Sequence, residues 1–188
     1  MEWLRKRSSA LSDYWRPVAL ICVFFLVALT VVHAVGDYTV TDFFTFWLAG
    51  RMTLQGQDVY SATLWQAGHQ YYGSTWMPNP FFPYPITLSL FLVPLGLLPL
   101  KFAYLSWVFA TQVLLTLSIF LLTASWKGSE WANLRYLLVI SMFPFRPVLV
   151  TLFSAQLVAF FLLVSSLAVY FWKQGRWFLG GMIISLLT

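Results

Sequence analysis

Residues 86–100 read ITLSLFLVPLGLLPL, and this stretch decides how the chain is arranged. It is strongly apolar, but at about 15 residues it is shorter than the ~20 that a membrane-spanning helix needs. Pro94 and Pro99 lie inside it and two further prolines come just before it, which disfavours a long regular helix. We predict that this segment lies in the membrane interface and does not cross the bilayer.

The composition around this stretch is that of an integral membrane protein. Hydrophobic residues make up 60% of the 188 positions and charged residues only 9%. A soluble domain carries roughly 25% charged residues to cover its surface. The net charge of +5 comes from short basic clusters scattered between apolar runs, which argues against nucleic-acid binding. Cys22 is the single cysteine, so an intrachain disulfide is excluded.

The remaining apolar stretches predict an all-α membrane protein that crosses the bilayer several times. We expect spans at residues 17–35, 102–125, 136–153 and 157–172, with an incomplete one at 177–188. The first run is longer than the ~7–15 residues of a secretory signal, so we interpret it as a retained span, with a cleaved signal as the alternative. A chain ending inside a membrane helix leaves carbonyl groups unpaired. We therefore expect residues 1–188 to form a single membrane domain, the N-terminal part of a longer protein.

The distribution of basic residues favours the arrangement in which residues 86–100 do not cross. In that arrangement eight of the eleven basic residues share the cytoplasmic side with the N-terminus, and only Arg51, Lys101 and Arg146 lie outside. If the segment does cross, six lie inside. Cytoplasmic segments of membrane proteins carry the excess of Lys and Arg, which supports the first arrangement. Residues 36–101 are then one long external loop of a cell-membrane protein.

This loop contains a second predicted interfacial helix, at residues 42–54. Apolar residues recur there at helical spacing, at Phe43, Phe46, Trp47, Gly50 and Leu54. Asp42 opens the helix, and local sequence leaves two interpretations open. It is either the N-cap, whose carboxylate accepts hydrogen bonds from the first free N–H groups, or a carboxylate held at the outer membrane surface for chemistry.

Motifs for metal binding or nucleophilic catalysis do not occur in the sequence. His33 and His69 each stand alone, without a second ligand three or four residues away. There is also no glycine-rich phosphate loop and no cysteine pair. We expect neither a metal nor a cofactor, and we interpret each histidine as a solvated or interfacial side chain.

Several motifs together resemble glycosyltransferase family 87. The run from Asp42 to Arg51, DFFTFWLAGR, followed by a glycine and Tyr60, is similar to the start of that family. These are polyprenyl-phosphate-mannose-dependent mannosyltransferase-like proteins of the GT-C superfamily. The box FPYP at 82–85 is similar to the family's aromatic-Tyr-Pro-Pro box, with isoleucine replacing the second proline. The run SAQ at 154–156 is similar to its Gly-Gln element, with alanine in place of glycine.

The resemblance implies a GT-C-like helical bundle that transfers a sugar, most simply mannose, from a polyprenyl-phosphate carrier on the outer face. The acceptor would be a hydroxyl group of a lipid or glycan, and the transfer would invert the anomeric centre. Asp42 matches the position of the general base. Arg146, and after it Arg51, would neutralise the leaving phosphate, and Tyr84 and Gln156 would bind substrate.

Two other classes stay open at this point. A lipid or small-solute transporter or flippase would also be multi-pass, although its predicted spans should then carry acidic residues, which these nearly lack. A non-catalytic membrane protein is the second alternative. Arg146 itself has a simpler interpretation, as an arginine whose stem lies in lipid and whose head reaches the interface.

Overall fold

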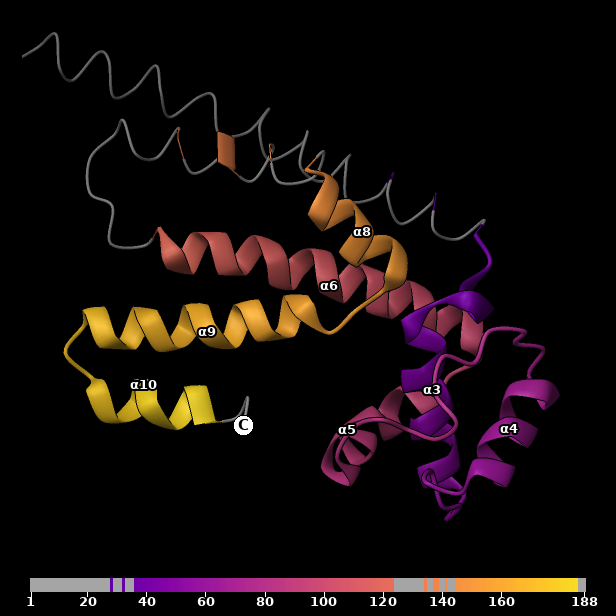
Figure 1. Cartoon of the computed structure of the whole chain (residues 1–188). Helices are drawn as coiled ribbons and strands as arrows, with labels where there is room; N and C mark the ends of the chain where they lie inside the picture. Colours follow the sequence, from indigo (N-terminus) through magenta and orange to yellow (C-terminus); the bar gives the residue numbers. More distant parts are fainter. Residues whose placement is uncertain are drawn as a thin grey trace, which may run out of the picture. The chain divides into compact units, whose positions relative to one another are not determined.

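The computed structural model describes residues 36–123 and 145–185, together with Ala28, Val32, Leu134, Leu137, Leu138 and Ser141. Within these ranges the protein is helical and contains no strand, which confirms the all-α part of the predicted fold (Figure 1). The elements are a 3-10 helix η1 (Tyr38–Val40) and the α-helices α3 (Asp42–Leu54), α4 (Ala62–Tyr71), α5 (Ile86–Gly96), α6 (Leu100–Leu122), α8 (Arg146–Ser154), α9 (Val158–Lys173) and α10 (Trp177–Ile184). The predicted first span, 17–35, lies almost wholly outside the described residues, and so do six of the eighteen residues of the span at 136–153.

Helix α6 is the one helix in the described part of the chain that is long and apolar enough to cross a bilayer. Its 23 residues rise about 34 Å, compared with ~30 Å for the hydrocarbon core. It begins at Leu100, two residues before the predicted start of this span. The crossing itself, and the multi-pass arrangement, stay predictions.

The stretch that was predicted to form an interfacial segment at 86–100 is divided between two helices. Helix α5 covers Ile86–Gly96 with Pro94 inside it, and Leu100 already belongs to α6. The break falls just before Pro99, since the ring of a proline disfavours helical geometry in the residue that precedes it. At 11 residues, α5 rises about 16 Å, which is too short to cross a bilayer by itself.

The chain divides into two compact units, each described here by itself. The cavity unit consists of Thr30–Phe109 and Phe153–Gln156. The hairpin unit consists of Met1–Leu29, Ala110–Leu152 and Leu157–Thr188. Helix α6 contributes its first turns to the cavity unit and the rest to the hairpin unit.

Helix α3 is the centre of the cavity unit, and the prediction that it is amphipathic is wrong. Its bounds are those predicted, 42–54, but side chains on every side of it are buried. Phe44 and Leu48, which fall outside the predicted apolar stripe, are 0% and 1% exposed, while Leu54, inside the stripe, is 42% exposed. The helix is covered by α4, α5 and the aromatic residues around them. A helix that is buried all round has no polar face to present to water.

The contact between α3 and α5 is unusually close because glycines face each other across it. A Cβ atom on Gly50 would lie 2.2 Å from the backbone oxygen of Leu92, and one on Gly96 would lie 2.6 Å from the backbone nitrogen of Arg51. Two hydrogen bonds from side chains of α3 stabilise this contact. Trp47 Nε1 donates to the Leu98 carbonyl at 3.0 Å, and the Arg51 guanidinium donates to the Gly96 carbonyl at 2.9 Å.

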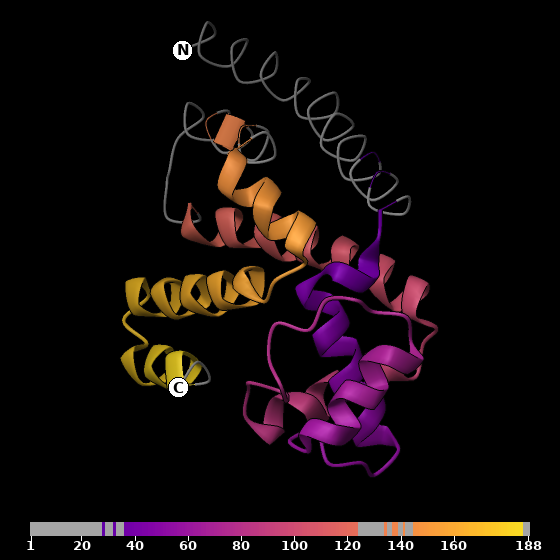
Figure 2. The ribbon, with the colours of Figure 1, turned by 45° about the vertical axis from the view of Figure 1, so that its right-hand side comes forward.

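The hairpin unit is built on packed apolar helices. Helices α9 and α10 lie side by side and run in opposite directions, as both Figure 1 and Figure 2 show. Leu115, Leu152 and Ala159 form the buried centre of a cluster contributed by α6, α8 and α9. Helix α9 differs by one residue at each end from the predicted span at 157–172.

Candidate functional site

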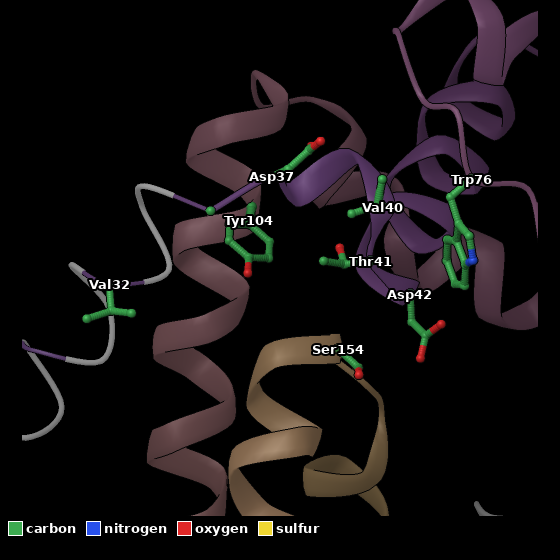
Figure 3. Close-up of a pocket in the computed structure, with 9 residues that line it drawn as sticks. Val32, Asp37, Val40, Thr41, Asp42, Trp76, Tyr104 and Ser154 are labelled. Atoms are coloured by element: carbon green, nitrogen blue, oxygen red, sulfur yellow. The ribbon is translucent and has the colours of Figure 1, made fainter.

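A cavity of about 350 Å³ opens in the cavity unit at the start of α3 (Figure 3). Its volume is within the range of small-molecule sites. The described residues that line it come from four segments distant in sequence: Val32, Gly36, Asp37, Val40, Thr41, Asp42, Trp76, Tyr104 and Ser154. Polar and aromatic groups therefore meet in one hollow, which is the usual composition of a binding site.

Asp42 lies in this cavity and is not the N-cap of α3. The N-cap is Thr41, and Asp42 is the first residue of the helix. The first turn is closed by the backbone, since Phe44 N donates to the Thr41 carbonyl at 3.0 Å. The Thr41 hydroxyl donates backwards to the Tyr38 carbonyl at 2.9 Å. The capping interpretation of Asp42 is therefore wrong, and its half-buried carboxylate is available for another role.

The two neighbouring acids differ from Asp42 in having structural hydrogen bonds. The Asp37 carboxylate accepts from the Thr39 hydroxyl at 2.6 Å and from Thr39 N at 2.9 Å, and these bonds lower the pKa of Asp37 below its ordinary value. The Asp58 carboxylate accepts from Tyr60 N at 2.9 Å. In Figure 3 the Asp37 and Asp42 carboxylates point in different directions.

The Asp42 carboxylate makes no hydrogen bond and no ion pair with any described residue. A carboxylate whose lone pairs are unoccupied can accept a proton from a bound hydroxyl group, which is what a general base requires. Of the three acids in the described part of the chain, Asp42 is the one that lines the cavity and whose carboxylate makes no hydrogen bond there.

Aromatic packing holds the start of α3 against α6. Phe43 stacks edge-on against Tyr104 with ring centres 5.4 Å apart, and Trp107 contacts both Phe43 and Phe46, at 5.8 and 5.7 Å. Phe43, Phe46 and Tyr104 are buried and Trp107 is half-buried, so the position of the first turn of α3 is determined by large apolar contacts.

The same Trp107 fixes the turn that brings Ser154 to the cavity. Its indole Nε1 donates to the Ala155 carbonyl at 2.9 Å. Ala155 is buried and has a φ of 51°, a left-handed conformation that costs roughly 1–2 kcal/mol for a residue other than glycine. The turn is therefore held by its surroundings, and it leaves the Ser154 hydroxyl at the cavity wall.

Tyr84 is brought near Asp42, although it does not line the cavity. Its ring contacts Phe46 at 5.6 Å and Phe82 at 5.4 Å, and its carbonyl accepts from the Tyr60 hydroxyl at 2.8 Å. Burial raises the pKa of Tyr84, and the negative charge of Asp42 raises it further. The phenol is therefore neutral and able to donate a hydrogen bond close to the carboxylate.

The other predicted site residues are not among those that line the cavity. Arg51 lies about 14 Å further along α3 than Asp42, and its guanidinium is bonded to the Gly96 carbonyl. Gln156 is half-buried two residues after Ser154. Arg146 is the exposed first residue of α8 and belongs to the hairpin unit. Substrate contacts by these three residues stay predictions.

His69 is buried and does not fit the solvated or interfacial interpretation. It is 2% exposed and lies against the rings of Phe44 and Trp65, at 5.1 and 5.0 Å. Its Nδ1 is 3.0 Å from the Trp65 carbonyl and must donate, because a carbonyl only accepts. Burial lowers the pKa of His69, against the smaller raising effect of that hydrogen bond. His33 lies outside the described residues.

Sequence reasoning missed two residues of the cavity, Trp76 and Tyr104. Nothing in the local sequence distinguishes these two aromatic residues from the other tryptophans and tyrosines. Ser154 was noticed only as part of the SAQ run. The signal that could have found all three is spatial proximity to Asp42, which the sequence does not display.

These features define the class of the protein. It is an α-helical chain with a bilayer-length apolar helix, and near the first turns of that helix lies a cavity in which the Asp42 carboxylate has no partner among the described residues. The profile of glycosyltransferase family 87 matches residues 81–188, more than half of the chain. The chain belongs to glycosyltransferase family 87. It is therefore an enzyme of the glycosyltransferase class, with a sugar donor and an acceptor as substrates. Comparisons with curated proteins and with solved structures find no match.

The matched region begins at Phe81, so it contains Tyr84, Arg146 and Gln156 but not Asp42. The case for Asp42 therefore rests on the cavity and on the state of its side chain.

Proposed function

We propose that this glycosyltransferase moves a mannosyl group from a polyprenyl-phosphate carrier to a hydroxyl group of a lipid or glycan acceptor, with Asp42 as general base. Membership of family 87 supports the transfer of a sugar. The observation that carries the role of Asp42 is its carboxylate, which lies in the cavity without a partner among the described residues while Asp37 and Asp58 are hydrogen-bonded.

In the proposed reaction the Asp42 carboxylate takes the proton of the acceptor hydroxyl as the oxygen attacks the anomeric carbon. A new carbon–oxygen bond forms on one face of the sugar. The bond to the phosphate oxygen breaks on the opposite face, and its electron pair leaves with the polyprenyl phosphate. The anomeric configuration is inverted, and the proton resides on Asp42 until the product departs. The base must lie roughly 2.6–3.2 Å from the acceptor oxygen.

The leaving phosphate gains negative charge, and a cation near it would lower the barrier. We assign this role to Arg146, whose exposed guanidinium can form two parallel hydrogen bonds to phosphate oxygens. Arg51 is the weaker candidate, because its guanidinium is already bonded to the Gly96 carbonyl and sits at the far end of α3.

The proposed setting is the outer face of the cell membrane, with the N-terminus in the cytoplasm and residues 36–101 outside. Helix α6 supports a membrane location through its length and composition. A cavity near the first turns of such a helix would lie close to the depth of a lipid phosphate.

The test is the Asp42→Asn variant of the full-length protein, assayed in membranes with polyprenyl-phosphate [¹⁴C]mannose as donor. Asparagine keeps the size of the side chain and removes its basicity, so transfer should fall by about 10²–10⁴. The expression level and the unfolding temperature should stay close to wild type, because Thr41 and not Asp42 caps the helix.

Asp58→Asn is the matched control, since that acid lies in the same unit but outside the cavity. It should transfer mannose at the wild-type rate. An Asp42→Asn protein that transfers as fast as wild type would remove Asp42 from catalysis and leave the base to be sought elsewhere.

A further inference from the structure

Trp76 is an aromatic residue of the cavity whose ring has no structural partner among the described residues. It lines the cavity together with Asp42, and Figure 3 shows both side chains at the same end of the hollow. Among the described residues its indole makes no ring contact and no hydrogen bond. By contrast, the neighbouring rings are paired: Tyr38, Phe43, Phe44, Phe46, Trp47, Trp65, Tyr72, Phe82 and Tyr84 all contact another ring.

The backbone at Trp76 is nevertheless held in place by Ser74. The buried Ser74 hydroxyl donates to the Thr39 carbonyl at 2.6 Å and accepts from Trp76 N at 3.3 Å. These bonds tie the segment that carries Trp76 to η1, next to the first turn of α3. A half-buried indole on a fixed backbone has lost much of its freedom before any ligand arrives, which favours binding.

The chemistry of an indole face matches one side of a sugar ring. A pyranose carries several C–H groups on one face, and these bear slight positive charge, while the face of an aromatic ring is negative. Stacking the two buries apolar surface on both and leaves the hydroxyl groups at the rim free to form hydrogen bonds. In this cavity the groups available at the rim are the Asp42 carboxylate and the Ser154 hydroxyl.

We propose that Trp76 is the platform on which a pyranose ring of a substrate stacks in the cavity. This inference rests on the proposed function, since Asp42 is the group toward which the stacked ring presents a hydroxyl or its anomeric carbon. The ring has two possible sources, the mannosyl group of the donor or a sugar of the acceptor. Both present the same C–H face to the indole.

The experiment compares Trp76→Leu, Trp76→Phe and the control Trp177→Leu, each in the full-length protein reconstituted in lipid nanodiscs. Leucine keeps an apolar side chain but has no ring face, while phenylalanine keeps a smaller ring. Trp177 is 69% exposed on α10, outside the cavity unit, so its replacement controls for the loss of an exposed tryptophan. Unfolding temperatures establish that each variant is folded.

Two measurements separate the sources of the sugar. The first is the KM for polyprenyl-phosphate mannose, and the second is saturation-transfer NMR with methyl α-D-mannopyranoside as a free sugar probe. A donor sugar on Trp76 predicts that Trp76→Leu raises the donor KM about tenfold, with partial recovery in Trp76→Phe. An acceptor sugar predicts loss of saturation transfer to the ring protons of the mannoside, with the donor KM unchanged.

A folded Trp76→Leu protein in which neither measurement differs from wild type would overturn the inference. Asp42→Asn distinguishes this failure from failure of the proposed function. If Trp76 binds sugar, the Asp42→Asn protein should lose transfer activity but keep the wild-type donor KM and the wild-type saturation transfer to the mannoside. Should Asp42→Asn instead retain transfer, the general base is wrongly assigned, and the Trp76 variants still report sugar stacking independently.

Discussion

Replacing Gly50 by alanine should separate α3 from α5 and unfold the cavity unit at a lower temperature. The added Cβ atom would lie 2.2 Å from the Leu92 carbonyl oxygen and 2.7 Å from its carbon, and both are backbone atoms that no rotamer change can move. Comfortable contacts of this kind are about 3.5 Å, so the two helices must move apart by about 1 Å.

The cost follows from the bonds that cross the same interface. A 1 Å separation would lengthen the Trp47–Leu98 and Arg51–Gly96 hydrogen bonds, now 3.0 and 2.9 Å, beyond useful length. Losing them costs about 1 kcal/mol for the indole and roughly 1.5–3 kcal/mol for the charged group. With the ~1–3 kcal/mol of strain that overpacking adds, the loss of unfolding free energy is about 3.5–7 kcal/mol. The unfolding temperature should fall by roughly 10–25 °C.

The assay is thermal unfolding of the full-length protein in detergent, followed by intrinsic tryptophan fluorescence. Gly181→Ala is the matched control, because Gly181 also lies within a helix but its added Cβ meets nothing within 4 Å. That control should unfold at the wild-type temperature or slightly above it, since alanine favours helix by about 1 kcal/mol over glycine. A Gly50→Ala protein with the wild-type unfolding temperature would show that the close contact of α3 and α5 is not formed.

Two further predictions concern His69 and Arg146. Because burial lowers the pKa of His69 below its ordinary 6.5, the unfolded chain binds the proton more tightly. The stabilising contribution of the neutral histidine is then complete above about pH 6.5 and is lost as the pH falls below it. Between about pH 7.5 and 5.5 the unfolding temperature of the wild type should therefore drop by more than that of His69→Asn. Asparagine is the comparison because it keeps a donor for the Trp65 carbonyl. Arg146→Ala should raise the donor KM and Arg146→Lys should restore it only in part, because lysine lacks the planar fork of donors; wild-type kinetics in both variants would exclude contact with the phosphate.

Helix positions were predictable because they depend on local features of the sequence. The bounds of α3 are those expected from the spacing of its apolar residues, and α9 differs by one residue at each end from the expected 157–172. The prolines of residues 86–100 disfavoured a long regular helix, but the division of this stretch between α5 and α6 was not predicted. The surroundings of α3 were not predictable, because residues such as Phe44 and Leu48 are buried by partners from distant segments.

The sequence by itself determined that the chain is helical, rich in apolar segments, and related by its motifs to glycosyltransferase family 87. It also singled out Asp42, but it could not separate a capping carboxylate from a free one, because both interpretations fit the same residue at the start of a helix. Only the tertiary structure decided that Thr41 is the cap, and that Asp42 shares a cavity with Trp76 and Ser154. The physical reason is that periodicity and capping act over a few residues. The cavity, in contrast, depends on packing between segments that are far apart along the chain, such as the contact of Trp107 with α3 and with the Ala155 turn.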